Sequence, residues 1–307
     1  MYNLKPSDFN RRNISFGLFR LYKSAVQQLN KLRRAGRPGD QTILFILGIQ
    51  RAGTSLMYWV FERDFDVKIY RESSELTSGD VLEHVRLNPL PEVKARIGRA
   101  SAPVVVLKPL VESQRVHELL ATFPGSKALW QYRHYQDVAS SNLKAFGMDN
   151  GLKDLQPFLE NDPNNWRSQN SSTETRETLR RFVRDDMNPY DAAALFWWAR
   201  CRLYFDLKLD RDPNVLLCRY EDLATNPAGV MRRVYNFIDR AYPGDHITRD
   251  VHPQSVGKGR VSKLSPEVDR LCADLLAQLD QQNEASLRAA GATPAAPTQT
   301  PAVQPAH

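Results

Sequence analysis

The sequence predicts a doubly wound α/β domain, in which a parallel sheet is flanked by helices, and two observations lead to this expectation. Short continuous apolar runs recur after residue 41, and segments with helical periodicity lie between them. This alternation is typical of a parallel sheet buried on both faces. In addition, a glycine-bounded turn joins the first run to a helical segment, as in P-loop-like phosphate-binding units. The 307 residues, 42% of them hydrophobic, are enough for one sizeable domain.

The elements follow from the pattern of apolar residues. The predicted strands are 43–47, 67–70, 104–107, 128–132 and 215–218. A helix over 56–63 follows the first strand. Residues 190–209 are apolar on nearly all sides, so we expect a helix that is buried in the core. The sequence Ser265-Pro266-Glu267 is typical of a helix start and predicts a last helix running through Leu279.

We place the α/β domain at residues 41–289, with two flanking segments and one insertion. Residues 1–40 form a basic arm. The Asn-rich stretch 147–189 interrupts the α/β pattern and predicts a polar insertion that could act as an acceptor lid. Residues 290–307 contain four prolines and no Lys, Arg, Asp or Glu, so we expect a disordered tail.

The positive charge is concentrated at the N-terminus. The formal net charge is +7, and residues 1–40 alone carry nine basic and two acidic groups, so the remainder balances. A nucleic-acid-binding face would spread its charge over the fold, and we expect no nucleic-acid partner. One apolar stripe recurs at three- and four-residue steps along a helix, at Ile14, Leu18, Leu21, Ala25, Leu29 and Leu32. We expect this stripe to pack on the domain; the alternative is an anionic membrane surface, bound through residues 1–37.

Other features favour a metal-free protein of the cytoplasm, peripheral at a membrane if the arm binds lipid. No apolar run is long enough to span a bilayer, and the first residues lack the apolar core of a secretory signal. Cys201, Cys218 and Cys272 are widely spaced, which predicts reduced, buried thiols. The six histidines form no metal-binding motif.

The turn after the first strand has the composition of a phosphate-binding loop. It reads Gly48-Ile49-Gln50-Arg51-Ala52-Gly53-Thr54-Ser55. Glycines permit a tight turn, and the free amides of Gly53, Thr54 and Ser55 at a helix start can bind an anion. The GxxxxG spacing is that of an ATP-binding loop, but Thr54 stands where such loops carry lysine, and Arg51 supplies the positive charge. A small-molecule kinase of the P-loop class remains the alternative function.

A second basic group with a nearby hydroxyl follows the strand 128–132. Arg133 stands at the carboxyl end of that strand, and Ser141 lies eight residues later in the next helix. Both belong to the edge of the sheet at which ligands bind in such folds. They suggest a second phosphate in the same ligand.

With these motifs, the sequence resembles the sulfotransferases that use 3′-phosphoadenosine 5′-phosphosulfate (PAPS), over residues 42–282. It is closer to bacterial and carbohydrate-type members than to cytosolic phenol-type members. The loop from Gly48 to Ser55, including Ala52, resembles the 5′-phosphosulfate loop of the family, and Arg133 with Ser141 matches its 3′-phosphate motif. Tyr220-Glu221-Asp222-Leu223 resembles a segment whose tyrosine lies near the adenine. The late basic glycine loop corresponds to Ser255, Val256, Gly257, Lys258, Gly259 and Arg260, with the choice between Lys258 and Arg260 left open.

The resemblance implies metal-free, in-line transfer of a sulfuryl group from PAPS to a hydroxyl or amine. Arg51 would face the leaving oxygen, and Lys108 resembles the second cation of the family. Cytosolic members carry a histidine base two residues after that lysine, where this chain has Leu110. Glu72 resembles the acidic base of carbohydrate-type members, and the other candidates are Glu75, Glu112 and His117. The acceptor would be a carbohydrate, a lipid or another small molecule, in a pocket shaped by residues 72–100 and 147–189.

Overall fold

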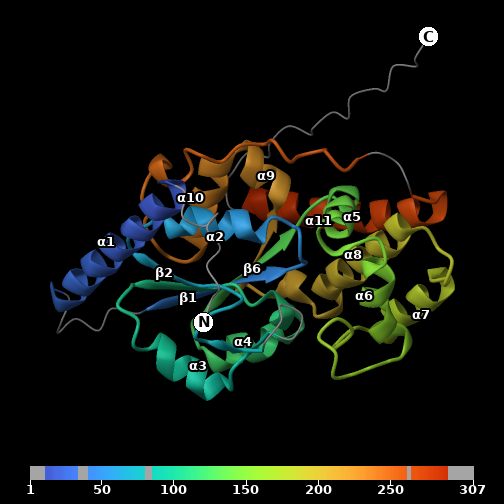
Figure 1. Ribbon diagram of the computed structural model, residues 1–307, viewed down its shortest axis with the longest axis horizontal. Helices are drawn as coiled ribbons and strands as arrows, with labels where there is room; N and C mark the ends of the chain where they lie inside the picture. Colours follow the sequence, from blue (N-terminus) through green and yellow to red (C-terminus); the bar gives the residue numbers. More distant parts are fainter. Residues whose placement is uncertain (1–10, 34–40, 80–84, 261–263, 290–307) are drawn as a thin grey trace, which may run out of the picture.

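The computed structural model of the protein describes residues 11–33, 41–79, 85–260 and 264–289 (Figure 1). Its centre is a five-stranded sheet in the order β2-β5-β1-β6-β7, and every pairing in it is parallel. The strands are β1 (Thr42–Gly48), β2 (Val67–Tyr70), β5 (Val104–Leu107), β6 (Lys127–Tyr132) and β7 (Val215–Arg219). All five predicted strands are confirmed, as is the doubly wound α/β class.

Helices cover both faces of this sheet (Figure 1). The helices are α1 (Arg11–Arg33), α2 (Thr54–Glu62), α3 (Leu90–Ile97), α4 (Val116–Thr122), α5 (Tyr135–Phe146), α6 (Asn150–Leu159), α7 (Thr173–Phe182), α8 (Pro189–Asp206), α9 (Tyr220–Thr225), α10 (Pro227–Phe237) and α11 (Pro266–Ala289). Short 3₁₀ turns are η2 (Leu110–Arg115), η3 (Leu209–Arg211) and η4 (Asp245–Ile247). A small antiparallel pair joins β3 (Thr77–Ser78) to β4 (Arg86–Leu87).

Strand β1 lies in the middle of the sheet and shows why these runs form strands. Phe45 pairs with Leu107 of β5 on one side and with Ala128 of β6 on the other. Successive side chains of a strand point to opposite faces. Leu44 and Ile46 therefore join the core cluster that includes α2 and α10, whereas Phe45 joins the cluster that includes α3, α5 and α8. A strand that is buried on both faces needs a continuous apolar sequence.

Helix α8 is buried, as the sequence predicts. Trp197 and Leu195 are fully covered, and Arg200 is buried with its guanidinium donating to the backbone carbonyls of Trp166 and Arg167. The segment 147–189, expected as a polar insertion, contains α6 and α7. Its apolar side chains enter the main core, with Leu155, Phe158, Trp166 and Leu179 all buried. This segment is therefore a packed helical layer on α8.

Helix α1 forms where the sequence predicts it, but the expected packing of its apolar stripe is wrong. Leu18, Leu21 and Leu29 are exposed, whereas the polar side chains of Lys23 and Gln27 are buried against the domain. These two donate hydrogen bonds to backbone carbonyls of residues 62–67, which fixes the rotation of the helix about its axis.

Some expectations fall outside the described residues, namely those for 1–10, 34–40 and the tail at 290–307. Cys201, Cys218 and Cys272 are buried free thiols, as predicted. Within the described ranges, no helix combines the length and apolarity required to cross a bilayer. The same ranges hold no cluster of three or more His, Cys, Asp or Glu side chains suited to a metal ion.

Candidate functional site

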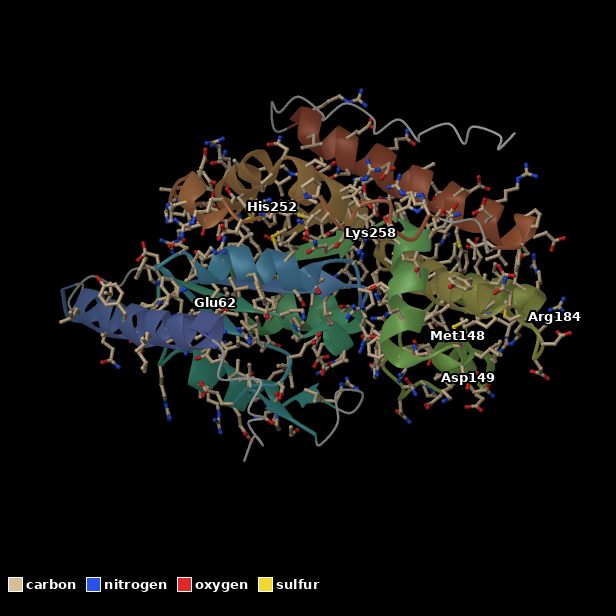
Figure 2. All side chains as sticks on the ribbon, turned by 45° about the horizontal axis from the view of Figure 1, so that its top comes forward. Glu62, Met148, Asp149, Arg184, His252 and Lys258 are labelled. Atoms are coloured by element: carbon tan, nitrogen blue, oxygen red, sulfur yellow. The ribbon has the colours of Figure 1, made fainter. Side chains whose placement is uncertain are left out.

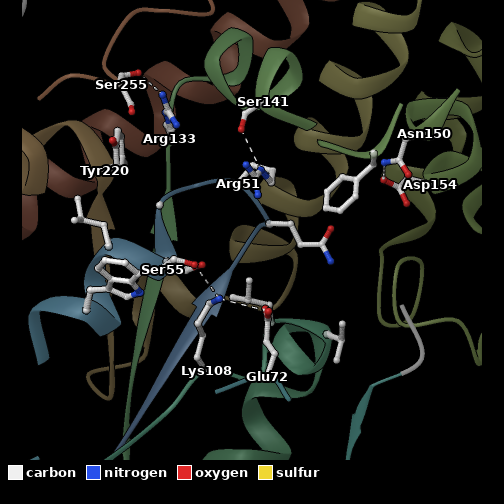
Figure 3. Close-up of a pocket in the computed structure, with 18 of the residues that line it drawn as sticks. Arg51, Ser55, Glu72, Lys108, Arg133, Ser141, Asn150, Asp154, Tyr220 and Ser255 are labelled. Atoms are coloured by element: carbon white, nitrogen blue, oxygen red, sulfur yellow. Dashed lines mark hydrogen bonds and ion pairs between the residues drawn. The ribbon is translucent and has the colours of Figure 1, made fainter. Parts of the chain in front are cut away.

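A cavity of about 660 Å³ opens at the carboxyl edge of the sheet, where the loop after β1 meets the ends of β5 and β6 (Figure 3). Many of the site residues predicted from the sequence line this cavity. They are Arg51, Gly53, Thr54, Ser55, Glu72, Lys108, Arg133, Ser141, Tyr220 and Ser255. Gly48, Ala52 and residues 256–260 do not line the cavity, although the last segment is joined to it by the hydrogen bond from Arg133 to the Ser255 carbonyl. Segments distant in the sequence thus meet at one edge of the sheet.

The loop between β1 and α2 requires its two glycines. Gly48 has a positive φ of 123°, and a side-chain carbon there would lie 2.2 Å from the carbonyl oxygen of Gln131. Gly53 has a φ of 82°, and a carbon there would lie 2.1 Å from the ring of Tyr220. Gly53 also precedes α2 without any side-chain cap. The first amides of the helix are therefore left available to an anion.

Two cations flank this helix start. Arg51, itself at a positive φ of 67°, donates from Nε to Ser141 Oγ at 3.0 Å. Lys108 Nζ lies 3.3 Å from Ser55 Oγ and 3.4 Å from Glu72 Oε2 (Figure 3). Burial lowers the pKa of Lys108, and the neighbouring Glu72 carboxylate acts in the opposite sense. The site thus concentrates positive charge around the helix start.

The structure separates the four candidate bases. Glu72 lines the cavity, and its side chain is 28% exposed. Glu75 is exposed and lies at a different cavity, beside α1. His117 is exposed and donates from Nε2 to the Leu207 carbonyl if the proton is on that nitrogen. Of the four, Glu72 alone lines the cavity at the carboxyl edge.

Glu112, the remaining candidate, is completely buried and serves as a structural anchor. Its carboxylate accepts hydrogen bonds from the guanidinium groups of Arg86 and Arg115 and from the amide of Leu87. Burial opposes ionisation of this carboxyl, but the hydrogen bonds and charge of Arg86 hold its pKa below the ordinary value. Glu112 therefore ties β4 to η2.

The second cationic corner is built around Arg133 at the end of β6. Its guanidinium lies over the Tyr220 ring, 4.3 Å from the centroid, and donates to the Ser255 carbonyl. Arg260 approaches from the glycine loop, with its Nε 3.8 Å from a carboxylate oxygen of Asp137. Arg133 Nε and both Nε and Nη2 of Arg260 are buried without a hydrogen-bond acceptor, and the nearest carboxylates, of Asp137 and Glu221, lie 3.6 to 3.9 Å from these guanidinium groups. Buried donors of this kind are normally satisfied, so an anion would fit here.

Asp137, in the first turn of α5, holds the glycine loop in place. Its two carboxylate oxygens accept from the amides of Gly257 at 3.0 Å and Gly259 at 2.6 Å. Gly259 has no space for a side chain, because a carbon there would lie 2.7 Å from the carbonyl oxygen of Gln136. Lys258 is exposed, whereas Arg260 turns inward, so the geometry favours Arg260 over Lys258 as the second cation of this corner.

The far wall of the cavity contains residues that sequence reasoning did not single out. Asp154 of α6 accepts from Asn150 Nδ2 at 2.7 Å and from Arg167 Nε at 2.6 Å. The aromatic rings of Trp59 and Phe146 are about half exposed beside the same cavity. The other lining residues that were not singled out are Gln50, Leu56, Val85, Leu110, Val111, Asp250, His252 and Gln254. The sequence indicated this wall only through the segments 72–100 and 147–189, which contain Val85, Asn150 and Asp154.

Comparison with known proteins identifies the fold and the family. A family model described as a sulfotransferase domain matches residues 41–265. The sulfotransferase domain of the Synechococcus PCC 7002 olefin synthase superposes with a TM-score of 0.50 at 17% identity, covering 80% of this chain and 96% of that one. The corresponding domain of the curacin biosynthetic pathway gives 0.48 at 16% identity, covering 76% and 97%. A mouse sulfotransferase complexed with PAP gives 0.40 at 16% identity, covering 81% and 88%.

A search of curated proteins gives no match. The family match nevertheless extends from the start of β1 to the beginning of the last helix and so includes the whole sheet and the cavity. Because it covers well over half of the chain, this protein belongs to the sulfotransferase family.

Proposed function

We propose that this protein transfers the sulfuryl group of PAPS to a hydroxyl or amine of a small-molecule, carbohydrate or lipid acceptor. The observation that carries the proposal is the presence of two cationic corners in and behind one cavity. One corner consists of Arg51, Lys108 and the start of α2, and the other of Arg133 and Arg260. PAPS carries anionic groups at both its 5′ and 3′ positions, so it matches two separated corners.

The residues present fit this donor. The buried donors of Arg133 and Arg260 would bind the 3′-phosphate together with Ser141, and Tyr220 lies directly beneath Arg133. The uncapped amides of α2 and Arg51 would bind the 5′-phosphosulfate. Charge-assisted hydrogen bonds of this kind are the stronger ones in proteins, which favours binding through several such contacts.

In the proposed reaction, the acceptor oxygen bonds to sulfur while the bond from sulfur to the phosphate oxygen breaks. Negative charge grows on the departing phosphate, and Arg51 stabilises it electrostatically because an arginine stays protonated. Lys108 supplies a second positive charge, beside Ser55. The acceptor proton passes to the Glu72 carboxylate, which lies 3.4 Å from Lys108 Nζ.

The alternative, a kinase that transfers phosphate from a nucleoside triphosphate, is not favoured. Family membership points to sulfuryl transfer, and the β1–α2 loop places Thr54 where a P-loop kinase carries its phosphate-binding lysine. A kinase would require Mg²⁺ together with ATP, which gives the two functions different ligand requirements.

Calorimetric titration of the full chain tests the proposal, with adenosine 3′,5′-bisphosphate without metal and ATP with Mg²⁺ as ligands. We expect binding of the bisphosphate without metal, loss of that binding in Arg133→Ala, and about fivefold weaker binding in Ser141→Ala, the value of one hydrogen bond of about 1 kcal/mol. Arg232→Ala is the matched control, because Arg232 is an exposed arginine of α10 paired with Asp245. Preference for ATP with Mg²⁺ would overturn the proposal.

A further inference from the structure

Helix α1 is attached to the domain through polar side chains and through edge-on contacts of the Phe19 and Tyr22 rings with the Phe65 ring. Lys23 Nζ donates to the Glu62 carbonyl at 2.7 Å, and Gln27 Nε2 donates to the carbonyls of Phe65 at 2.8 Å and Val67 at 3.0 Å. Arg20 Nε adds an ion pair with the Glu62 carboxylate at 2.6 Å. Figure 2 shows α1 extending from the body beside Glu62. These contacts determine which face of α1 the domain covers.

The opposite face of α1 is apolar and exposed. The exposed fractions are 63% for Leu18, 71% for Leu21, 63% for Tyr22 and 57% for Leu29. At 100° per residue, all four lie within one arc that faces away from Lys23 and Gln27. A helix stabilised only by its own domain would bury its leucines, and a contiguous exposed apolar face marks an interaction surface.

The charge of this helix indicates the partner. Its sequence from Arg11 to Arg33 contains six Lys or Arg residues and no Asp or Glu. A second cavity, beside α1, is lined by Arg20, Lys68 and Arg71. The carboxylates of Glu62 and Glu75 line the same cavity. An apolar face on a basic helix is the combination that binds anionic lipid surfaces. A dimer formed through this face would place two such cationic helices against each other, which like charges oppose.

We propose that α1 docks this protein on an anionic membrane surface. Leu18, Leu21 and Leu29 enter the boundary between headgroups and acyl chains, and Tyr22 lies at the headgroup level. The net positive charge of the helix sequence attracts the lipid phosphates. The adjoining helix α2 carries both Glu62, which α1 contacts, and Trp59, which lines the cavity at the sheet edge. Docking would therefore hold the catalytic domain close to the lipid surface. This inference does not depend on the identity of the sulfuryl donor.

The test is co-sedimentation of the full chain with vesicles of phosphatidylcholine alone and of phosphatidylcholine with phosphatidylglycerol. We expect binding to the mixed vesicles that weakens as NaCl rises, since salt screens the lipid charge. The double variant Leu21→Gln/Leu29→Gln should bind at least about tenfold more weakly, because burial of each leucine contributes about 1.5 kcal/mol or more. Met148→Gln removes a side chain that is 50% exposed, far from α1, and should bind like the wild type (Figure 2).

Two further measurements make the result decisive. Far-UV circular dichroism and thermal unfolding report whether the double variant is folded, and a replacement at Leu21 alone repeats the test if it is not. Absence of binding to the mixed vesicles, equal binding to both vesicle types, or unchanged binding of the leucine variants would overturn the proposal. So would a wild-type dimer that the leucine variants dissociate without lipid, because the face would then join two copies of the chain.

Discussion

Arg51 Nε and Ser141 Oγ lie 3.0 Å apart, although their residues are 90 positions apart in the chain. In the proposed function the first serves the 5′-phosphosulfate and the second the 3′-phosphate. The two groups hydrogen-bond to each other, so in the proposed function binding of the donor would exchange this contact for contacts with phosphate. Arg51 also adopts a left-handed backbone conformation, with a φ of 67°, which is uncommon for a residue other than glycine.

Arg51→Ala should abolish most turnover while the protein stays folded. The guanidinium is exposed enough to be removed without opening the core, and in the proposed reaction its loss would remove a positive charge that stabilises the departing phosphate. By comparison with the loss of one charge-stabilising donor in other enzymes, we expect a fall in kcat on the order of 10²–10³-fold. Steady-state sulfuryl-transfer assays and thermal unfolding check this. A melting temperature reduced together with activity would show that Arg51 serves the fold.

Glu72→Gln should lower kcat and spare nucleotide binding. The amide keeps the size of the carboxylate but cannot accept the acceptor proton, and general bases typically contribute about 10²–10⁴-fold. The measurement is kcat together with the Kd for adenosine 3′,5′-bisphosphate. Glu75→Gln is the matched control, because Glu75 lies outside the cavity at the carboxyl edge of the sheet. A large loss of nucleotide affinity in Glu72→Gln would contradict the assignment of Glu72 as the base.

Gly53→Ala should impair the nucleotide site through its backbone. A methyl group there would lie 2.1 Å from the Tyr220 ring at a φ of 82°, so both the loop and the ring must move. We expect at least tenfold weaker binding of adenosine 3′,5′-bisphosphate, measured by calorimetry. Gly125→Ala is a useful comparison, because Gly125 has a similar φ of 79° but no atom within 4 Å of the added carbon. Equal binding by both variants would show that the contact with Tyr220 is unimportant.

Asp137→Asn should weaken the glycine loop. Asp137 is buried and accepts from two amides, whereas an asparagine would direct an NH₂ group at one of them. Hydrogen bonds to a charged group contribute about 1.5–3 kcal/mol, so we expect roughly ten- to hundredfold weaker nucleotide binding. Limited proteolysis at the loop, with and without adenosine 3′,5′-bisphosphate, provides the structural measurement. Unchanged affinity would mean that the loop keeps its position without this anchor.

Local sequence patterns were sufficient for the sheet and for the position of the glycine-bounded turn between β1 and α2. Strands such as β1 are buried on both faces, so their apolar runs identify them without knowledge of their neighbours. The loop around Gly53 is likewise a local feature, because its glycines and its cation are contiguous in the chain. Arg133 and Ser141 could be predicted to lie near each other because Arg133 directly follows β6 and Ser141 lies in α5, the next helix along the chain.

The orientation of α1 and the choice of base could not be read from the sequence, because distant partners determine them. Lys23 is buried because its amine reaches the carbonyl of Glu62, which is 39 residues away. Glu112 is excluded from the cavity because Arg86, from another segment, binds its carboxylate. Periodicity indicates which residues share a face, but the burial of that face depends on such long-range polar contacts.

His134 should make the stability of the protein depend on pH in a mildly acidic range. It precedes α5 and accepts a hydrogen bond from the Gln136 amide through Nδ1, and burial lowers its pKa from 6.5 to about 4. Between these values the unfolded chain binds a proton that the folded protein does not, so the free energy of unfolding falls as pH falls from about 6.5 to 4.

Urea unfolding at several pH values measures this dependence, with His134→Asn as the variant, because asparagine can also cap the helix. The variant should show a shallower dependence over this range than the wild type. Identical slopes for the wild type and His134→Asn would show that other groups cause the dependence.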